Sequence, residues 1–134
     1  MTMNFQGFFD SVPDALFFTL HGSRLFGVEG PESDWDVKGV RLPPARDLLL
    51  GDRKALAPLE HKLDNGEAAV HALQHFLDML EKADTNAIDM LFAARSERGL
   101  LAVSAPGRRL LAELDPRRLV SRNLNGALSY ARSQ

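Results

Sequence analysis

The sequence predicts an α+β protein, in which a small mixed β-sheet is flanked by helices and the C-terminal part is helical. The candidate strands lie early in the chain, and helical periodicity dominates later. Runs of strands followed by runs of helices are typical of this class, although the order alone also permits an α/β fold. The 134 residues, 45% hydrophobic and 25% charged, suffice for one ordinary core.

Composition also excludes several classes of protein. The chain has no cysteine, which rules out disulfides and thiolate metal sites. Its formal net charge of −2 provides no global basic field for nucleic acid. No apolar run is long enough to span a membrane, and Asp10 and Asp14 stand where a signal peptide would be basic and then apolar. We therefore expect a cytoplasmic protein with no membrane partner, and the oligomeric state is not predicted.

The N-terminal elements are a short helix and a buried strand. Residues 4–11 predict the helix, with three phenylalanines on one side, and Pro13 limits its length. Residues 15–21, ALFFTLH, form a continuous apolar run that is typical of a strand buried on both faces. Gly22 and Ser23 interrupt this run, and Ser23 is a good N-cap for a short following helix.

A second strand is predicted over residues 35–41, and Pro43 and Pro44 end it. Alternation places Asp34, Asp36 and Lys38 on one face, opposite Trp35 and Val37. Residues 45–58 are loop-like, with a helical turn near 46–50. LEHKL and EAAVHAL around Asp-Asn-Gly predict two further strands joined by a turn.

Four helical stretches follow. The clearest is 71–82, where apolar residues recur at helical spacing. A second spans 85–94, with Thr85 or Asn86 as its cap. Stretches near 106–113 and 116–131 complete the series, and Asp115 with Pro116 is a start signal for the last. We expect residues 1–95 to form the core domain and 96–134 to form a helical extension, the start of an incomplete C-terminal helical region.

Asp34 and Asp36 form a candidate metal site. Two carboxylates at positions i and i+2 of a strand point the same way, and carboxylate oxygens are the ligands that Mg²⁺ prefers. A pair of divalent metals is a common device for displacements at phosphorus. Taken alone, however, Ser-Asp-x-Asp is more often a solvated turn.

Gly22, Ser23, Arg24 and Lys38 are candidates for binding the phosphates of a nucleotide. Glycine lets the backbone approach closely, and a helix N-terminus presents free N–H groups to anions. Arg24 suits a bidentate phosphate contact, and Lys38 shares the face of Asp36. Gly-Ser alone is equally often a plain helix cap. The combination, with a predicted strand on each side, favours nucleotidyl transfer.

The motifs GSRLFG at 22–27, SDWD at 33–36 and VKGV at 37–40 resemble the DNA polymerase beta-like nucleotidyltransferase superfamily. They are closest to the RNA-repair-associated, RlaP-type nucleotidyltransferases of bacteria and phages. The segment LQHFLDMLEKADTNAIDMLFA at 73–93 is similar to a helical region of that branch, with Ala83-Asp84-Thr85 in place of the usual Gly-Asn-Pro. The terminal SYARSQ is similar to the start of a further helical region. The resemblance thus implies the nucleotidyltransferase fold.

The resemblance also implies a third carboxylate on a neighbouring strand. Glu67 is the first choice, because this branch places an acid on the strand that leads into the Phe76 helix. Asp64 is the alternative, but an Asp-Asn-Gly turn explains Asp64 without catalysis. We therefore expect Asp34, Asp36 and Glu67 to be both the catalytic residues and the metal ligands, with Glu67 on the ion that activates the acceptor hydroxyl.

Histidine and arginine provide weaker signals. His71 and His75 are four residues apart in the helix predicted over 71–82, a spacing that zinc sites use, but no adjacent glutamate supports zinc and we favour surface or packing roles. Five arginines make the C-terminal part locally basic, either as a solvated face or as a track for a nucleic-acid backbone. They are Arg108, Arg109, Arg117, Arg118 and Arg122.

The leading hypothesis is a metal-dependent nucleotidyltransferase that moves a nucleoside monophosphate from a nucleoside triphosphate to a hydroxyl. The expected cofactor is Mg²⁺ or Mn²⁺. The acceptor is expected to be an RNA or DNA end, with a protein hydroxyl or a small molecule as alternatives. The rival hypothesis is a non-catalytic binding or regulatory module with the same fold.

Overall fold

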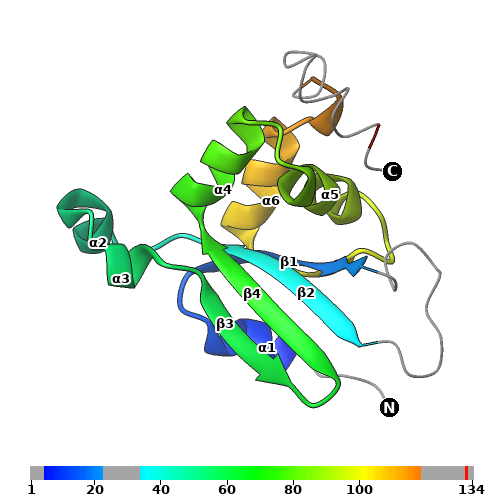
Figure 1. The fold of residues 1–134 in the computed structure, drawn as a ribbon, viewed down its shortest axis with the longest axis horizontal. Coiled ribbons are helices and arrows are strands. Elements are labelled where there is room, and N and C mark those ends of the chain that lie inside the picture. Colours follow the sequence, from blue (N-terminus) through cyan, green and yellow to red (C-terminus); the bar gives the residue numbers. More distant parts are fainter. Residues whose placement is uncertain (1–4, 23–33, 119–131, 133–134) are drawn as a thin grey trace.

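The computed structural model describes residues 5–22, 34–118 and 132, and within them the chain forms one five-stranded mixed sheet (Figure 1). Its strand order is β3-β4-β2-β1-β5. β2 and β4 are parallel, and the other neighbours are antiparallel. The strands are β1 (Ala15–His21), β2 (Trp35–Arg41), β3 (Leu59–Leu63), β4 (Gly66–Ala72) and β5 (Leu100–Val103).

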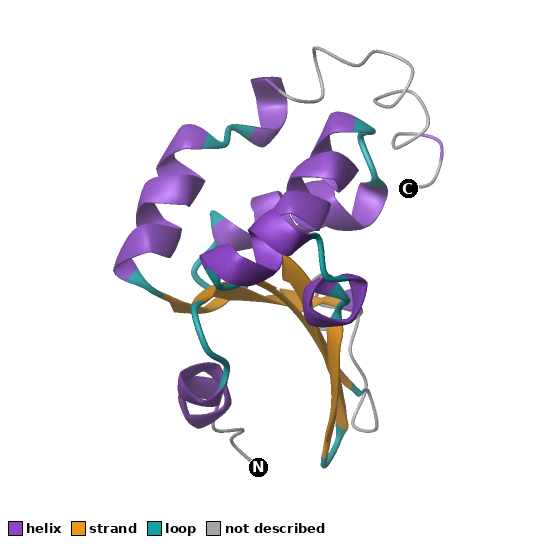
Figure 2. Cartoon of the chain, turned by 90° about the vertical axis from the view of Figure 1, so that its left-hand side faces the viewer, coloured by secondary structure: helices purple, strands orange, loops and turns teal. Residues whose placement is uncertain are grey.

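Helices cover both faces of this sheet. The helices α4 (Leu73–Glu81), α5 (Thr85–Ala94) and α6 (Ala105–Glu113) lie on one face, and α1 (Phe5–Ser11) lies on the other (Figures 1 and 2). Two short helices, α2 (Ala45–Leu50) and α3 (Arg53–Leu56), lie between β2 and β3 in the sequence and project to one side of the sheet (Figure 1). The predicted α+β class and mixed sheet are confirmed.

Each face of the sheet has its own hydrophobic core, because successive residues of a strand point to opposite faces. On the three-helix face, Phe17 and Val40 pack with Phe76, and the Phe17 and Phe76 rings meet edge to face at 5.8 Å. On the α1 face, Phe18 packs with Phe9 at 5.1 Å. The strand over 15–21 is therefore buried on both faces, as its composition predicted.

Three features of the helices and strands differ from the sequence predictions. The helix predicted over 71–82 begins at Leu73, because His71 and Ala72 belong to β4. The prediction that His71 and His75 share a helix is therefore wrong. The N-cap of α5 is Asp84, whose carboxylate accepts a hydrogen bond from Asn86 N, and not Thr85 or Asn86.

The sequence analysis also missed β5 and α3. β5 pairs with β1, so the sheet continues past the predicted domain boundary at residue 95. α3 begins at the N-cap Asp52, within a segment predicted to be loop. The last predicted helix does begin at Pro116, one residue after its cap Asp115, but residues 119–131 lie outside the described part.

No helix in the described ranges is long and apolar enough to cross a membrane.

Candidate active site

The strand registers bring two of the predicted carboxylates together. Asp36 on β2 is the register partner of Glu67 on β4, and on its other side Asp36 faces His21 of β1. Register partners on neighbouring strands project from the same face of a sheet. His21, Asp36 and Glu67 therefore form a row across three strands, on the face that carries α4, α5 and α6.

A cleft of about 570 Å³ opens at this row. Asp34, Asp36 and Glu67 all line it, together with Gly22 at the end of β1. The other lining residues are Trp35, Lys62, Leu63 and Gly66. Three carboxylates in one cleft create a strongly negative surface, which is suited to a cation or to the cations that accompany a polyphosphate.

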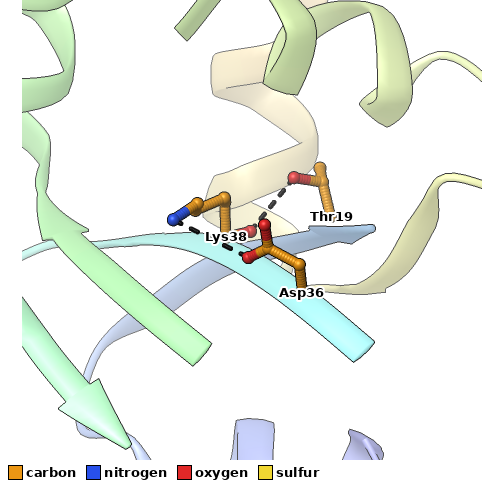
Figure 3. A network of polar contacts seen from close by, with 3 residues as sticks. All are labelled: Thr19, Asp36 and Lys38. Atoms are coloured by element: carbon orange, nitrogen blue, oxygen red, sulfur yellow. Dashed lines mark hydrogen bonds and ion pairs between the residues drawn. The ribbon is translucent and has the colours of Figure 1, made fainter. Parts of the chain in front are cut away.

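Asp36 is the most enclosed of these acids. Its Oδ1 lies 3.7 Å from the Lys38 ammonium, an ion pair along β2 (Figure 3). Thr19, which is fully buried, donates its hydroxyl to the Lys38 carbonyl oxygen at 3.0 Å and so ties β1 to β2 beneath the pair. The ammonium and the backbone carbonyl of Lys38 thus each make a contact that holds this part of β2 in place.

Two buried polar atoms of the row have no hydrogen-bond partner in the described part of the chain. They are Asp36 Oδ1 and His21 Nδ1, on neighbouring strands. Leaving a buried polar atom unpaired costs about 1–3 kcal/mol, and such atoms are uncommon in folded proteins. Of the two residues, Asp36 lines the cleft, so its Oδ1 is the atom that a ligand in the cleft can reach.

Gly22 brings the backbone close to Asp36. Its φ is +73°, a conformation that favours glycine, and a Cβ there would lie 3.5 Å from Asp36 Oδ2. The chain therefore leaves β1 directly beside the carboxylate. The close approach of this backbone to phosphates stays a prediction.

The β3–β4 hairpin fixes the position of Glu67. Asp64 and Asn65 form its turn, and Asn65 O accepts a hydrogen bond from Trp35 N at 2.6 Å. Gly66 packs so tightly that a Cβ would lie 1.8 Å from the Trp35 carbonyl oxygen. Close contact between the turn and the start of β2 thus sets the register that pairs Glu67 with Asp36.

The donor chemistry of the cleft fits a hard divalent cation, because its acids offer only carboxylate oxygens. Asp36 Oδ1, which is buried and has no hydrogen-bond partner among the described residues, is the atom best suited to be a ligand. Within residues 5–22 and 34–118, however, no three acidic or histidine side chains are already grouped as a metal site. Asp34 and Glu67 are exposed at the mouth of the cleft, where their side chains have room to turn toward an ion.

The predicted phosphate-binding residues are only partly described. Gly22 lies in the cleft, and Lys38 lies on the same face of β2 as Asp36. Ser23 and Arg24 lie outside the described residues. Asp64, the alternative third acid, lies in the hairpin turn and does not line the cleft.

The cleft also contains residues that the sequence analysis missed. Lys62 of β3 is the register partner of Glu67 and lines the cleft with it. No local motif marked this lysine, because only strand pairing brings it to the site. His21, the register partner of Asp36 on β1, does not line the cleft, and its buried Nδ1 has no hydrogen-bond partner among the described residues.

The remaining histidines and arginines lie apart from the cleft. His61 stacks on Phe8 with ring centroids 4.8 Å apart, a packing role. The rings of His71 and His75 lie 5.4 Å apart. The four arginines of the predicted basic track that the structure describes are all exposed, and Arg122 lies outside the described part. Their binding of nucleic acid stays a prediction.

Comparison with known proteins identifies relatives of the chain. Residues 10–106 match the model of the RlaP family, described as the RNA repair pathway DNA polymerase beta family. A similar protein is the "Uncharacterized 38.9 kDa protein in nrdC-mobD intergenic region" of Enterobacteria phage T4, which is 34% identical over 77 residues. That match covers 52% of this chain but only 23% of the phage protein. No solved structure matches the chain significantly.

Proposed function

The chain belongs to the RNA repair pathway DNA polymerase beta family, and on this basis we propose that it is a metal-dependent nucleotidyltransferase. The proposed reaction transfers a nucleoside monophosphate from a nucleoside triphosphate to a hydroxyl acceptor. The observation that carries the proposal is the cleft that Asp34, Asp36 and Glu67 line together with Gly22, where a buried Asp36 oxygen has no hydrogen-bond partner among the described residues.

Asp34, Asp36 and Glu67 would hold Mg²⁺ or Mn²⁺. When bound, such ions neutralise phosphate charge and polarise the reacting oxygens. Asp36 and Glu67 are well suited to this because they project from adjoining strands, so the hydrogen-bonded ladder fixes the spacing between them. Asp36 would be the central ligand, since it lies between His21 and Glu67 in the row.

The phosphates would lie at the Gly22 end of the cleft. The backbone there passes beside Asp36 with no side chain at Gly22 to obstruct it. Lys38, already paired with Asp36 at 3.7 Å, would exchange part of that contact for a phosphate oxygen of the triphosphate. Ser23 and Arg24, which follow Gly22 in the sequence, are proposed to contribute a hydroxyl donor and a guanidinium to phosphate binding.

The acceptor we favour is a nucleic-acid end, in keeping with the RNA-repair description of the family. A protein hydroxyl is the rival acceptor. The chain spans 23% of the phage relative that it matches, so any activity that needs other parts of such a protein belongs to this proposal as well.

Replacing Asp36 by Asn tests the metal-dependent site directly. Isothermal titration calorimetry with each of the four nucleoside triphosphates, in Mg²⁺ and then in Mn²⁺, measures binding to wild type and to Asp36→Asn. We expect the variant to lose affinity by about 100-fold or more, because a bound ion contributes several kcal/mol of charge stabilisation. Circular dichroism checks that the fold is retained.

Asp78→Asn is the matched control, because Asp78 is an exposed aspartate on α4 that does not line the cleft. It should bind triphosphate as wild type does. Unchanged metal-dependent binding and transfer in Asp36→Asn would contradict the proposal. Failure of wild type to bind any triphosphate with either ion would favour the non-catalytic module instead.

A further inference from the structure

Four neighbouring strands contribute one residue each to a continuous row. His21 ends β1 directly before Gly22, Asp36 lies on β2, Glu67 on β4 and Lys62 on β3. Asp36 pairs with Glu67, and Glu67 pairs with Lys62. Since neighbouring strands lie about 4.8 Å apart, the row spans roughly 14 Å from the β1 end to the β3 end.

Lys62 lies where two clefts adjoin. It lines the carboxylate cleft and also a second cleft of about 340 Å³, and Glu67 is the other residue shared by both. The second cleft is further lined by Lys38, Glu60, His61, Ala68 and Ala69. Lys62 is exposed and forms no ion pair within the described part of the chain. Its ammonium is thus available to a ligand that reaches both clefts.

The order of residues along the row indicates at which end of the cleft the acceptor would approach and at which end the phosphates would lie. In an in-line displacement, the acceptor oxygen and the departing pyrophosphate lie on opposite sides of the reacting phosphorus. With the phosphates at the Gly22 end, the acceptor must approach from the β4 and β3 end. Lys62 is the cation at that end, two strands away from Asp36.

We propose that Lys62 selects the acceptor, by binding a backbone phosphate of a single-stranded nucleic acid whose end lies in the carboxylate cleft. This proposal rests on the proposed function for the direction of approach. Lysine binds phosphate as a compact point charge, and contacts of this kind position a strand without reading its sequence. The second cleft would hold the nucleotide next to the reacting end.

Oligonucleotide binding tests this proposal without requiring transfer. The probe is a short fluorescein-labelled single-stranded RNA of mixed sequence, and fluorescence anisotropy in Mg²⁺ gives its Kd for the full chain. Lys62→Gln should weaken binding about five-fold near physiological salt. The slope of log Kd against log salt concentration should fall by about one unit, the contribution of one phosphate contact. Lys62→Arg should restore most of the affinity.

Lys54→Gln is the matched control, because Lys54 is an exposed lysine of α3 that lines neither cleft. It should bind the RNA as wild type does. Calorimetry with triphosphate and Mg²⁺ should give the same Kd for Lys62→Gln and wild type. In a transfer assay, the KM for the RNA should rise in Lys62→Gln while kcat and the KM for the triphosphate stay within about two-fold of wild type.

Three outcomes of the binding measurements would overturn the proposal. They are unchanged RNA binding and salt slope in Lys62→Gln, an equal loss in Lys54→Gln, and a weakened affinity for triphosphate, which would place Lys62 at the phosphate end. Transfer to a protein hydroxyl but to no oligonucleotide would also exclude it. Failure of wild type to bind triphosphate would contradict the proposed function and not the role of Lys62. The anisotropy measurement would still decide whether Lys62 binds RNA.

Discussion

His71 occupies an electrostatic environment that disfavours its charged form. Burial is the largest cause that lowers its pKa from the usual 6.5, and the charges of His75 and Lys38 lower it further. Asp84 acts in the opposite direction but is the smallest contribution. His71 Nδ1 is buried without a hydrogen-bond partner in the described part of the chain. Protonating His71 should therefore cost stability.

The expected consequence is a loss of stability in mild acid. The folded-state pKa of His71 lies below the unfolded value of 6.5, so the unfolded chain binds more protons once the pH falls through that value. The free energy of unfolding should decrease from about pH 7 toward pH 5. Urea unfolding at several pH values should show a shallower decrease for His71→Asn than for wild type.

His75→Asn should give an intermediate slope, because it removes only one of the two cations that lower the His71 pKa. If His71→Asn kept the full dependence of wild type, His71 would not be the group responsible.

At the scale of single residues, the sequence predicted what local spacing determines. Asp34 and Asp36 were expected to share a face from strand alternation, and both line the cleft, although Asp34 lies just before β2. Gly22 was noticed because it interrupts the apolar run of β1. Glu67 was chosen through resemblance to a family; the structure pairs it in register with Asp36, and its role as a metal ligand stays a prediction. Lys62 was missed, because its place depends on a pairing that no local pattern encodes.

At the scale of elements, the connection between α4 and α5 keeps a helix-ending turn although Ala83 stands where the family usually has glycine. Ala83 adopts a left-handed φ of 54°, at the position where related sequences were expected to have glycine. Ala83 N bonds Leu80 O at 3.0 Å and Asp84 N bonds Met79 O at 2.9 Å, which is the Schellman pattern of a helix C-terminus. Asp84 then caps α5, so the substitution retains the turn between the two helices.

Local sequence preference was misleading at β5 and at the boundary between β4 and α4. β5 has only four residues, Leu100–Val103, and leucine and alanine within it favour helix locally, so pairing with β1 decides its conformation. His71 and Ala72 continue an apolar helical periodicity, but the parallel pairing with β2 extends β4 through them. Tertiary hydrogen bonding overrides propensity in both cases.

The contact between Gly66 and β2 gives a prediction at the element scale. Gly66→Ala would place a Cβ 1.8 Å from the Trp35 carbonyl oxygen, so the hairpin must shift. We expect a loss of about 2–3 kcal/mol in the free energy of unfolding, together with weaker triphosphate binding as Glu67 moves away from Asp36. Urea unfolding and calorimetry measure the two effects.

Gly51→Ala is the control for backbone strain. Gly51 also has a positive φ, of 62°, but its added Cβ would meet nothing within 4 Å. It should cost about 1 kcal/mol and leave triphosphate binding unchanged. Equal effects of the two substitutions would argue against a register role for Gly66.

At the scale of the whole molecule, the sheet needs the segment beyond residue 95. β5 covers the outer edge of β1, and leucines of α6 pack against the core that contains Phe17. The sequence predicted the fold class and four strands in this molecule. It did not predict the strand order, because that order follows from pairings between distant segments.

A fragment of residues 1–95 should therefore fail to fold, since the edge of β1 and one side of the core would be exposed to water. We expect poorly dispersed amide resonances from this fragment in a ¹H–¹⁵N spectrum. Adding the 96–134 peptide should restore dispersion. A well-dispersed spectrum of the fragment alone would show that β5 and α6 are dispensable.

The parallel pairing of β2 with β4 also has a consequence for the newly made chain. Asp36 and Glu67 are separated in the sequence by α2, α3 and β3. The conformational entropy of this long connection is lost before the contacts between β2 and β4 can stabilise the chain. During translation, Asp36 leaves the ribosome well before its partner strand. We expect a nascent chain to remain unable to hold a triphosphate until β4 and the edge strand β5 have both emerged.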